Sequence, residues 1–247
     1  MSVRLVVIGS SSAGNSYALE TDKEILLIEA GIPLRKVRQR TDLTKVKGVI
    51  VSHHHKDHAE WVESYSMRFP VAAPQEVLAK CMPFNAVSIY EGKTFDFGGF
   101  RSTPFIVPHS NANGTQCINA GYLIHHREMG TALFATDTYM LPYKFEHINH
   151  FILEANYSDE KLWEYVELGK TTPPQADRIE LSHFSFENCV RTIQQCGTDS
   201  LKTVTLIHTS LRHGSHIQFE RRAKEIFGVP CFAARQGLTF TLVNDIV

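Results

Sequence analysis

Residues 52–58 read Ser52-His53-His54-His55-Lys56-Asp57-His58. Within this stretch an H-x-H-x-D-H pattern is formed by His53, His55, Asp57 and His58. Imidazoles are costly to bury without partners, and clustered imidazoles repel one another once they are protonated. Imidazole and carboxylate groups are good ligands for zinc and similar divalent ions, so a bound metal removes both costs. The pattern therefore predicts a metal site. The competing explanation is a solvated histidine-rich loop, which the aspartate within the run disfavours.

The position of this motif in the chain also favours a functional role. Residues 46–52 (VKGVIVS) form an apolar, β-branched run that predicts a buried strand, and residues 59–69 predict a helix. We therefore expect the motif on a strand-to-helix loop at the carboxyl edge of a sheet, where α/β proteins usually place their functional groups.

Composition indicates a globular protein. The 247 residues can bury a substantial core, and 43% are hydrophobic and 21% charged. A formal net charge of −1 excludes a strongly basic, histone-like binder but permits a nucleic-acid enzyme. Neither a signal peptide nor an apolar run of about 18 residues is evident, so no membrane span is expected. Five scattered cysteines without a C-x-x-C pattern are typical of reduced thiols, and we expect a cytoplasmic protein.

The order of predicted elements indicates an α/β fold. Strands are expected at residues 4–8, 16–21, 24–29, 48–52, 71–73, 100–107, 120–125, 132–135, 151–154, 204–207 and 238–243. Helices are expected at residues 59–69, 76–82, 186–196 and 218–227, the third after an N-cap at Ser185. Two strand-rich halves, each followed by helices, predict an αββα sandwich built as one domain over residues 1–247. The charged stretch 157–178 is predicted to be an insertion, either a lid or an idle surface loop.

Single polar residues follow three later strands, at or near the point where each strand ends. They are His109, Asp137 and His208. Any one of them alone would more often be a capping residue or a satisfied core residue. Together, and in this order after the first motif, they supply the additional ligands that a two-metal site requires.

This series of residues resembles the metallo-β-lactamase-fold hydrolases over nearly the whole chain. The resemblance implies a sandwich of two mixed sheets with helices outside, and two divalent ions per chain. Zinc is favoured, with manganese or iron as alternatives. The resemblance implies His53, His55 and His109 as ligands of one ion, Asp57, His58 and His208 as ligands of the other, and Asp137 as their bridge.

Shorter motifs narrow the resemblance to the YycJ-like exonuclease subfamily. Residues 9–16 (GSSSAGNS) are similar to its G-S-x-x-G-N opening, and residues 153–156 (LEAN) to its L-E-x-N. Residues 177–188 (DRIELSHFSFEN) resemble its R-I-x-x-x-H-L-S-N-E, and residues 208–210 (HTS) its H-L-S. The last two segments are also similar to transfer-RNA 3′-processing ribonucleases. The resemblance thus implies a binuclear metal-dependent phosphodiesterase, and most specifically a nuclease acting on DNA or RNA.

Two positions depart from the family pattern. Glu29 stands where the family usually has an aspartate that orients a metal ligand. Tyr157 stands where the subfamily has a histidine after Asn156.

The resemblance implies an attack on phosphorus by a metal-bridging hydroxide. Asp57 and Asp137 would orient this hydroxide or accept its proton. His183 would protonate the leaving alkoxide, or would instead only support a ligand or a helix cap. Further candidates for contact with substrate phosphate are Ser11, Asn15, Ser210 and Arg212.

Several alternatives stay open at this point. The near-neutral charge and the lack of a long transfer-RNA arm favour a small phosphodiester such as a cyclic nucleotide as the second choice of substrate. A thioester or lactone hydrolase is a third choice, and a metal-stabilised binding module without activity the last, since seven ligands for two ions leave room for water. The sequence does not decide between DNA and RNA, nor does it decide cleavage polarity or homo-oligomer formation.

Overall fold

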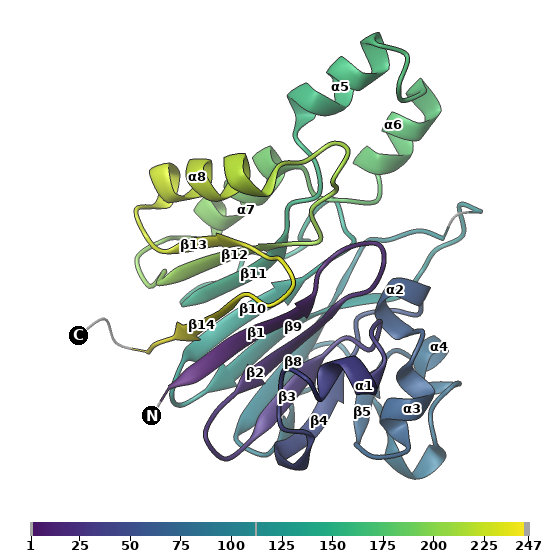
Figure 1. Cartoon of the computed structure of the whole chain (residues 1–247), viewed down its shortest axis with the longest axis vertical. Helices are drawn as coiled ribbons and strands as arrows, with labels where there is room; N and C mark the ends of the chain where they lie inside the picture. The colour runs from purple at the N-terminus through teal and green to yellow at the C-terminus, as the bar shows by residue number, and fades with distance from the viewer. Residues whose placement is uncertain (1, 112, 245–247) are drawn as a thin grey trace.

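Two seven-stranded sheets pack face to face, with helices on both outer faces (Figure 1). The computed structural model describes residues 2–111 and 113–244. Both sheets are mixed, so the predicted αββα sandwich is confirmed. None of the helices in these two ranges is long and apolar enough to cross a membrane.

The first sheet has the strand order β14-β1-β2-β3-β4-β5-β6. Its strands are β1 (Val3–Gly9), β2 (Ser16–Glu20), β3 (Ile25–Ile28), β4 (Val46–Ile50), β5 (Val71–Ala73), β6 (Ala86–Ser88) and β14 (Thr239–Leu242). Neighbours from β14 to β3 pair antiparallel, and neighbours from β3 to β6 pair parallel.

The second sheet repeats this arrangement with the strand order β13-β12-β11-β10-β9-β8-β7. Its strands are β7 (Phe95–Phe97), β8 (Phe100–Val107), β9 (Asn119–His126), β10 (Gly130–Ala135), β11 (His150–Glu154), β12 (Thr203–Ile207) and β13 (Cys231–Ala233). Neighbours from β7 to β10 pair antiparallel, and neighbours from β10 to β13 pair parallel. Because parallel strands end at the same edge, each sheet presents several carboxyl ends side by side.

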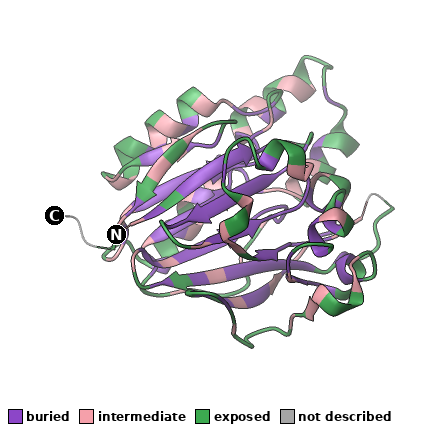
Figure 2. Ribbon diagram, turned by 60° about the horizontal axis from the view of Figure 1, so that its bottom comes forward, coloured by how far each residue is buried: buried purple, intermediate pink, exposed green. Residues whose placement is uncertain are grey.

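Three apolar layers hold the sandwich together. The middle layer packs the two sheets on each other through side chains such as Tyr17, Phe100 and Phe134. One outer layer lies under α1 (Leu34–Val37), α2 (Lys56–Ala59), α3 (Val62–Ser66) and α4 (Gln75–Leu78), and the other lies under α7 (Phe186–Cys196) and α8 (His216–Phe227). Figure 2 shows the buried residues running through the strands, while the helices expose their outward faces. Each buried Leu or Phe side chain contributes about 2–3 kcal/mol to this packing.

The predicted ends of α7 are confirmed. The hydroxyl of Ser185 accepts a hydrogen bond from the backbone N–H of Asn188, and the helix stops at Gly197, where φ is 86°. Residue 197 thus adopts a backbone conformation that glycine takes without strain. α8 similarly stops at Gly228, although it begins two residues earlier than predicted.

The single helix predicted over residues 59–69 is wrong. The chain forms two short helices, α2 and α3, which are separated at Trp61. The backbone N–H of Trp61 bonds to the carbonyl of Ala30, beyond the end of β3, and so leaves the helical pattern. α2 also begins at Lys56, which places Asp57 and His58 on a helix and leaves only the three preceding histidines on the loop.

The stretch 157–178 carries α5 (Asp159–Glu167) and most of α6 (Pro173–Glu180), which ends two residues beyond it. These helices form a hairpin that projects from the sandwich above the carboxyl ends of the second sheet (Figure 1). Its own small core is made by Tyr157, Leu162 and Ala176. We call residues 157–180 the cap; its role as a lid and the single-domain boundaries stay predictions.

Candidate metal centre

The carboxyl ends of four strands and the start of one helix converge on one point. His53 and His55 follow β4, and Asp57 and His58 lie in α2. His109 follows β8, Asp137 follows β10, and His208 follows β12. The structure thus brings together all seven predicted ligands: His53, His55, Asp57, His58, His109, Asp137 and His208.

The seven residues form two groups that share Asp137. The first group is His53, His55, His109 and Asp137, and the second is Asp57, His58, Asp137 and His208. Within each group, one potential ligand atom per residue lies within 4.8 Å of the others. The Oδ2 atom of Asp137 is 3.5 Å from Nε2 of His53 and 3.4 Å from Nε2 of His58, so one carboxylate faces both groups.

Several ring nitrogens of these groups fit metal ligation better than any protein partner. His53 is fully buried, and its Nε2 atom has no hydrogen-bond partner. Nδ1 of His55 and Nε2 of His109 face each other at 3.2 Å. Burial lowers the pKa of His109 to about 4 and that of His53 well below its ordinary value. Both rings are therefore held neutral, the form that binds a metal ion, and an ion in this group would satisfy their lone pairs.

Three residues at this edge have left-handed backbones, which are unusual for residues other than glycine. They are Glu29 (φ 67°), Asp137 (φ 50°) and His208 (φ 53°). Each lies one or two residues after a strand, so the chain turns sharply and directs the side chain toward the centre. Such conformations cost of order 1 kcal/mol each and tend to cluster at functional sites.

Glu29 lies behind the second group. Its Oε1 atom is 3.4 Å from Nδ1 of His58, while Oε2 accepts a hydrogen bond from the backbone N–H of Ser52. The carboxylate is fully buried and can orient the ring of His58.

Asn15 is fully buried and is not among the residues that line the pocket. Its contact with substrate phosphate stays a prediction. Its side-chain amide donates to Oδ2 of Asp57 at 3.3 Å and lies 3.1 Å from Nε2 of His58. The backbone N–H of Asn15 also donates to the carbonyl of Asp57 at 2.7 Å. Asn15 therefore helps to hold Asp57 and His58 in position.

Gly31 makes this close approach between chain segments feasible. Its backbone N–H donates to the carbonyl of Asn15, and a Cβ atom at this position would overlap the carbonyl oxygen of Asp57. Only glycine leaves room for the three segments to meet at this point.

Glu154 is the functional candidate that our reading of the sequence left without a role. It is fully buried at the end of β11, between the strands that carry Asp137 and His208. Its Oε1 atom is 2.7 Å from Nδ1 of His183 and 2.8 Å from Nδ1 of His208. A carboxylate only accepts hydrogen bonds, so both rings donate through Nδ1 and leave Nε2 for other contacts. Its position at a strand end was the signal that could have identified it.

His183 faces the pocket with a side chain that is 23% exposed. Burial disfavours its charged form, but the neighbouring Glu154 carboxylate outweighs this effect and raises the pKa of His183. The ring is thus disposed to hold a proton next to the two ligand groups.

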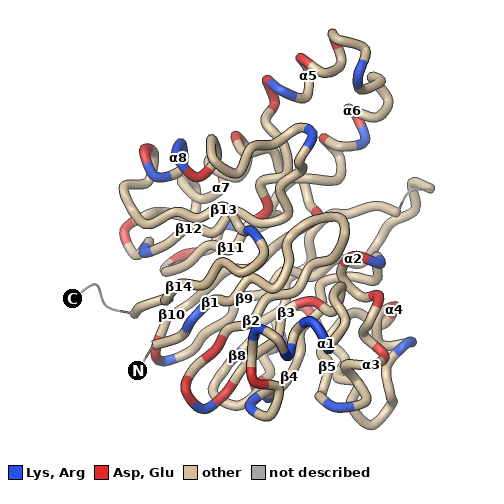
Figure 3. The backbone as a smooth tube through the Cα atoms, in the orientation of Figure 1, with Lys and Arg blue, Asp and Glu red and all other residues tan. Residues whose placement is uncertain are grey.

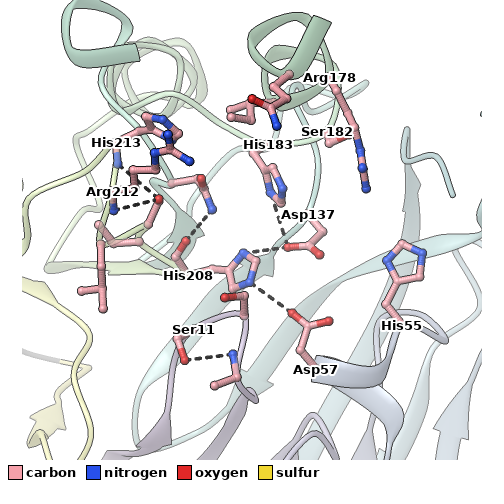
Figure 4. Close-up of a pocket in the computed structure, with 18 of the residues that line it drawn as sticks. Ser11, His55, Asp57, Asp137, Arg178, Ser182, His183, His208, Arg212 and His213 are labelled. Atoms are coloured by element: carbon pink, nitrogen blue, oxygen red, sulfur yellow. Dashed lines mark hydrogen bonds and ion pairs between the residues drawn. The ribbon is translucent and has the colours of Figure 1, made fainter. Parts of the chain in front are cut away.

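An open pocket of about 690 Å³ lies between the metal groups and the cap (Figure 4). Its floor includes His55, Asp57, His109, Asp137 and His208, while the predicted substrate contacts Ser11, Ser210 and Arg212 lie on its walls. The cap adds Arg178, Gln175 and Thr171, none of which was predicted.

Comparisons with known proteins agree with this geometry. A curated relative, exodeoxyribonuclease YycJ of Bacillus anthracis, is 25% identical in an alignment 231 residues long that covers 85% of this chain and 84% of the relative. The metallo-β-lactamase fold protein YhfI of Bacillus subtilis superposes with a TM-score of 0.75 at 17% identity, covering 98% of this chain and 100% of that one. Zinc-bound PqqB of Methylobacterium extorquens gives 0.68 at 14% identity, covering 96% and 99%.

The sequence profile described as "Beta-lactamase superfamily domain" matches residues 26–209, a span that includes all seven clustered residues. The match extends over most of the chain and confirms the family resemblance drawn from the motifs. The chain therefore belongs to the β-lactamase superfamily domain family.

Proposed function

We propose that this protein is a binuclear metal-dependent phosphodiesterase, and specifically a nuclease. One observation carries the proposal: two ligand groups joined by Asp137 open onto a pocket that is also lined by the cationic side chains of Arg178 and Arg212. An anionic substrate fits such a pocket. The similarity to an exodeoxyribonuclease supports nucleic acid as that substrate.

Two divalent ions would be held by the two groups, and zinc suits their histidine-rich donor sets best. The fold neighbour PqqB, which has zinc bound, supports this choice. Bound ions lower the pKa of water toward neutrality and offset the negative charge that develops on phosphate oxygens.

The other functional groups come from the chain itself. His183, charged by its pairing with Glu154, can donate a proton from Nε2 to the departing alkoxide. Asp57 has one oxygen near His58 and His208, and Asp137 faces both groups, so either carboxylate can orient the attacking water. The Ser11 and Ser210 side chains on the pocket walls can hydrogen-bond to a phosphate oxygen.

The proposal is tested by metal analysis of the purified protein together with a substrate panel. The panel contains bis-p-nitrophenyl phosphate, 5′-phosphorylated DNA and RNA, a cyclic nucleotide, a thioester and a lactone. We expect two ions per chain and hydrolysis of phosphodiesters that is lost in Asp137→Asn. Asp96→Asn, at an exposed position on β7 outside the pocket, is the matched control.

Two results would contradict the proposal. Turnover of the thioester or lactone with no turnover of any phosphodiester would assign a different reaction. Full phosphodiester activity of Asp137→Asn would remove the metal groups from the mechanism. Preference for the cyclic nucleotide would instead favour the second candidate, which the pocket volume also accommodates.

A further inference from the structure

We propose that Arg178 and Arg212 bind the two phosphates that flank the scissile phosphodiester. The substrate class is then a nucleic-acid strand with at least three consecutive phosphates, as opposed to a cyclic or single phosphodiester. This inference rests on the proposed phosphodiesterase function and adds to it the length of substrate that the site selects.

The first support is the placement of the two guanidinium groups. Both residues line the pocket, and Figure 4 shows them on opposite sides of it, with His183, Asp137 and His208 between and below them. A phosphodiester held above the metal groups would therefore have one cationic side chain on either side.

The second support is that these two charges are not neutralised. Within residues 2–111 and 113–244, neither guanidinium lies within ion-pair distance of a carboxylate, whereas Arg222 pairs with Glu187 at 3.0 Å. Arg212 lies over the ring of Tyr165 at 5.9 Å, a contact that leaves its N–H groups free to donate. The two carboxylates that line the pocket, Asp57 and Asp137, belong to the metal groups.

The third support is that the two arginines are held in a fixed relation. Thr171, which precedes α6, has its hydroxyl 2.9 Å from Nε2 of His213, the residue after Arg212. Both partners of this contact are buried. The amine of Lys161 on α5 also donates to the carbonyl of Gly214 at 3.0 Å. The cap and the loop before α8 thus form one unit that carries both guanidinium groups.

Charge in the surroundings agrees with this arrangement. In Figure 3 a basic position lies on α6 and another on the loop before α8, while α5 and α6 also carry acidic positions. Of the charged residues of α6, Arg178 is the one that lines the pocket. Each contact of a guanidinium with phosphate is charge-assisted and can be bidentate. Such a contact adds affinity for a substrate with a charged phosphate next to the scissile one, and adds none when that neighbouring group is neutral.

The test uses a set of short substrates of increasing charge. They are bis-p-nitrophenyl phosphate, the unphosphorylated dinucleotide NpN, the tetranucleotide NpNpNpN, and NpNpNpN with a neutral methylphosphonate in place of its first or its third linkage, in deoxyribo and ribo forms. The metal-loaded full-length protein is compared with Arg178→Gln, Arg212→Gln and Arg127→Gln. Arg127 is highly exposed after β9, at the opposite end of the second sheet, and serves as the control.

We expect wild type to favour cleavage at the central linkage of NpNpNpN over cleavage of NpN by about 10- to 100-fold in kcat/KM for each flanking charge. Each pocket variant should lose the preference for a charged linkage on one side of the scissile phosphate, mainly through a higher KM. On that side it should cleave the phosphate and methylphosphonate substrates equally well. Arg127→Gln should keep the wild-type preference. The deoxyribo and ribo series then show which nucleic acid the site prefers.

The outcomes separate the two proposals. If no phosphodiester is cleaved, the proposed function itself is wrong. The inference alone is overturned if bis-p-nitrophenyl phosphate is cleaved while flanking phosphates give no advantage. It is equally overturned if either pocket variant slows all substrates by one common factor. It is also overturned if only one of the two variants loses the preference for a charged flanking phosphate.

Discussion

The carboxylate of Glu154 lies 2.7 Å from Nδ1 of His183 through Oε1, and the same oxygen lies 2.8 Å from Nδ1 of His208. One buried carboxylate therefore fixes both a metal-facing ring and the ring proposed as proton donor. The effect on metal binding is measured as metal content, and the effect on the proton donor as kcat/KM.

Replacing this carboxylate should impair both functions. Glu154→Gln keeps the size but replaces one of the two acceptor oxygens by an NH2 donor, beside rings that both need an acceptor, and it removes the charge that raises the pKa of His183. We expect kcat/KM on a phosphodiester to fall by about 10- to 100-fold, as for other groups that orient metal ligands. Metal content should also fall. Glu160→Gln on the first turn of α5 is the control, and an unchanged kcat/KM in Glu154→Gln would contradict the role.

Removing metal should destabilise the fold. Ions occupying the site at about 100 times their dissociation constant stabilise the native state by about 2.7 kcal/mol. For a chain of this size, we expect a chelator to lower Tm by about 5–10 °C. Thermal unfolding with and without the chelator measures this shift. Asp137→Asn should show little further loss on chelation, and an equal loss in wild type and variant would place the stabilising metal elsewhere.

Gly31→Ala should damage the site more than the fold. The added methyl group would overlap the carbonyl of Asp57 and push the motif away from Asn15. Overpacking of this kind costs about 1–3 kcal/mol. We expect metal affinity and activity to fall together, as measured by metal titration and substrate turnover. Gly169→Ala is the comparison, since open space surrounds that position and only its φ of 65° is unfavourable. Equal metal affinity in both variants would refute the argument.

His150 should make the fold sensitive to acid. Burial lowers its pKa to about 4, although the ring bonds to the carbonyl of Met129. Below pH 6.5 the unfolded chain gains a proton that the folded chain does not accept until about pH 4, so stability is lost as pH falls through this window. The loss from this residue amounts to about 2 kcal/mol between pH 7 and pH 5.

The His150→Gln variant tests this contribution. Glutamine can still donate to the carbonyl of Met129 but does not titrate, so urea unfolding should show a smaller loss of stability between pH 7 and pH 5. His125→Gln, at an exposed position in β9, should behave like wild type. Identical pH dependence in wild type and His150→Gln would show that the residue plays no part.

The sequence predicted the fold class and the clustering of the seven ligands for the same physical reason. Apolar strands are recognised locally, and a polar residue at the end of each strand can point only toward the common edge. The same argument applies to Glu154, which ends β11, but the L-E-x-N motif at residues 153–156 assigned no role to this carboxylate.

Other features depended on contacts distant in sequence. The break at Trp61 comes from a hydrogen bond to Ala30, about thirty positions earlier in the chain. The helices of the cap were missed because their apolar faces are short and pack only on one another. The burial of Asn15 beside Asp57 was not predicted either, because it follows from the packing of three separate segments.

The two sheets have the same order of antiparallel and parallel strand pairings. The seven clustered histidine and aspartate residues are divided between them. The segment from β1 to β6 supplies His53, His55, Asp57 and His58, while the segment from β7 to β13 supplies His109, Asp137 and His208. Neither half alone contains a complete group, since each group needs residues from both. A metal ion bound by either group would therefore report directly on whether the two halves have docked.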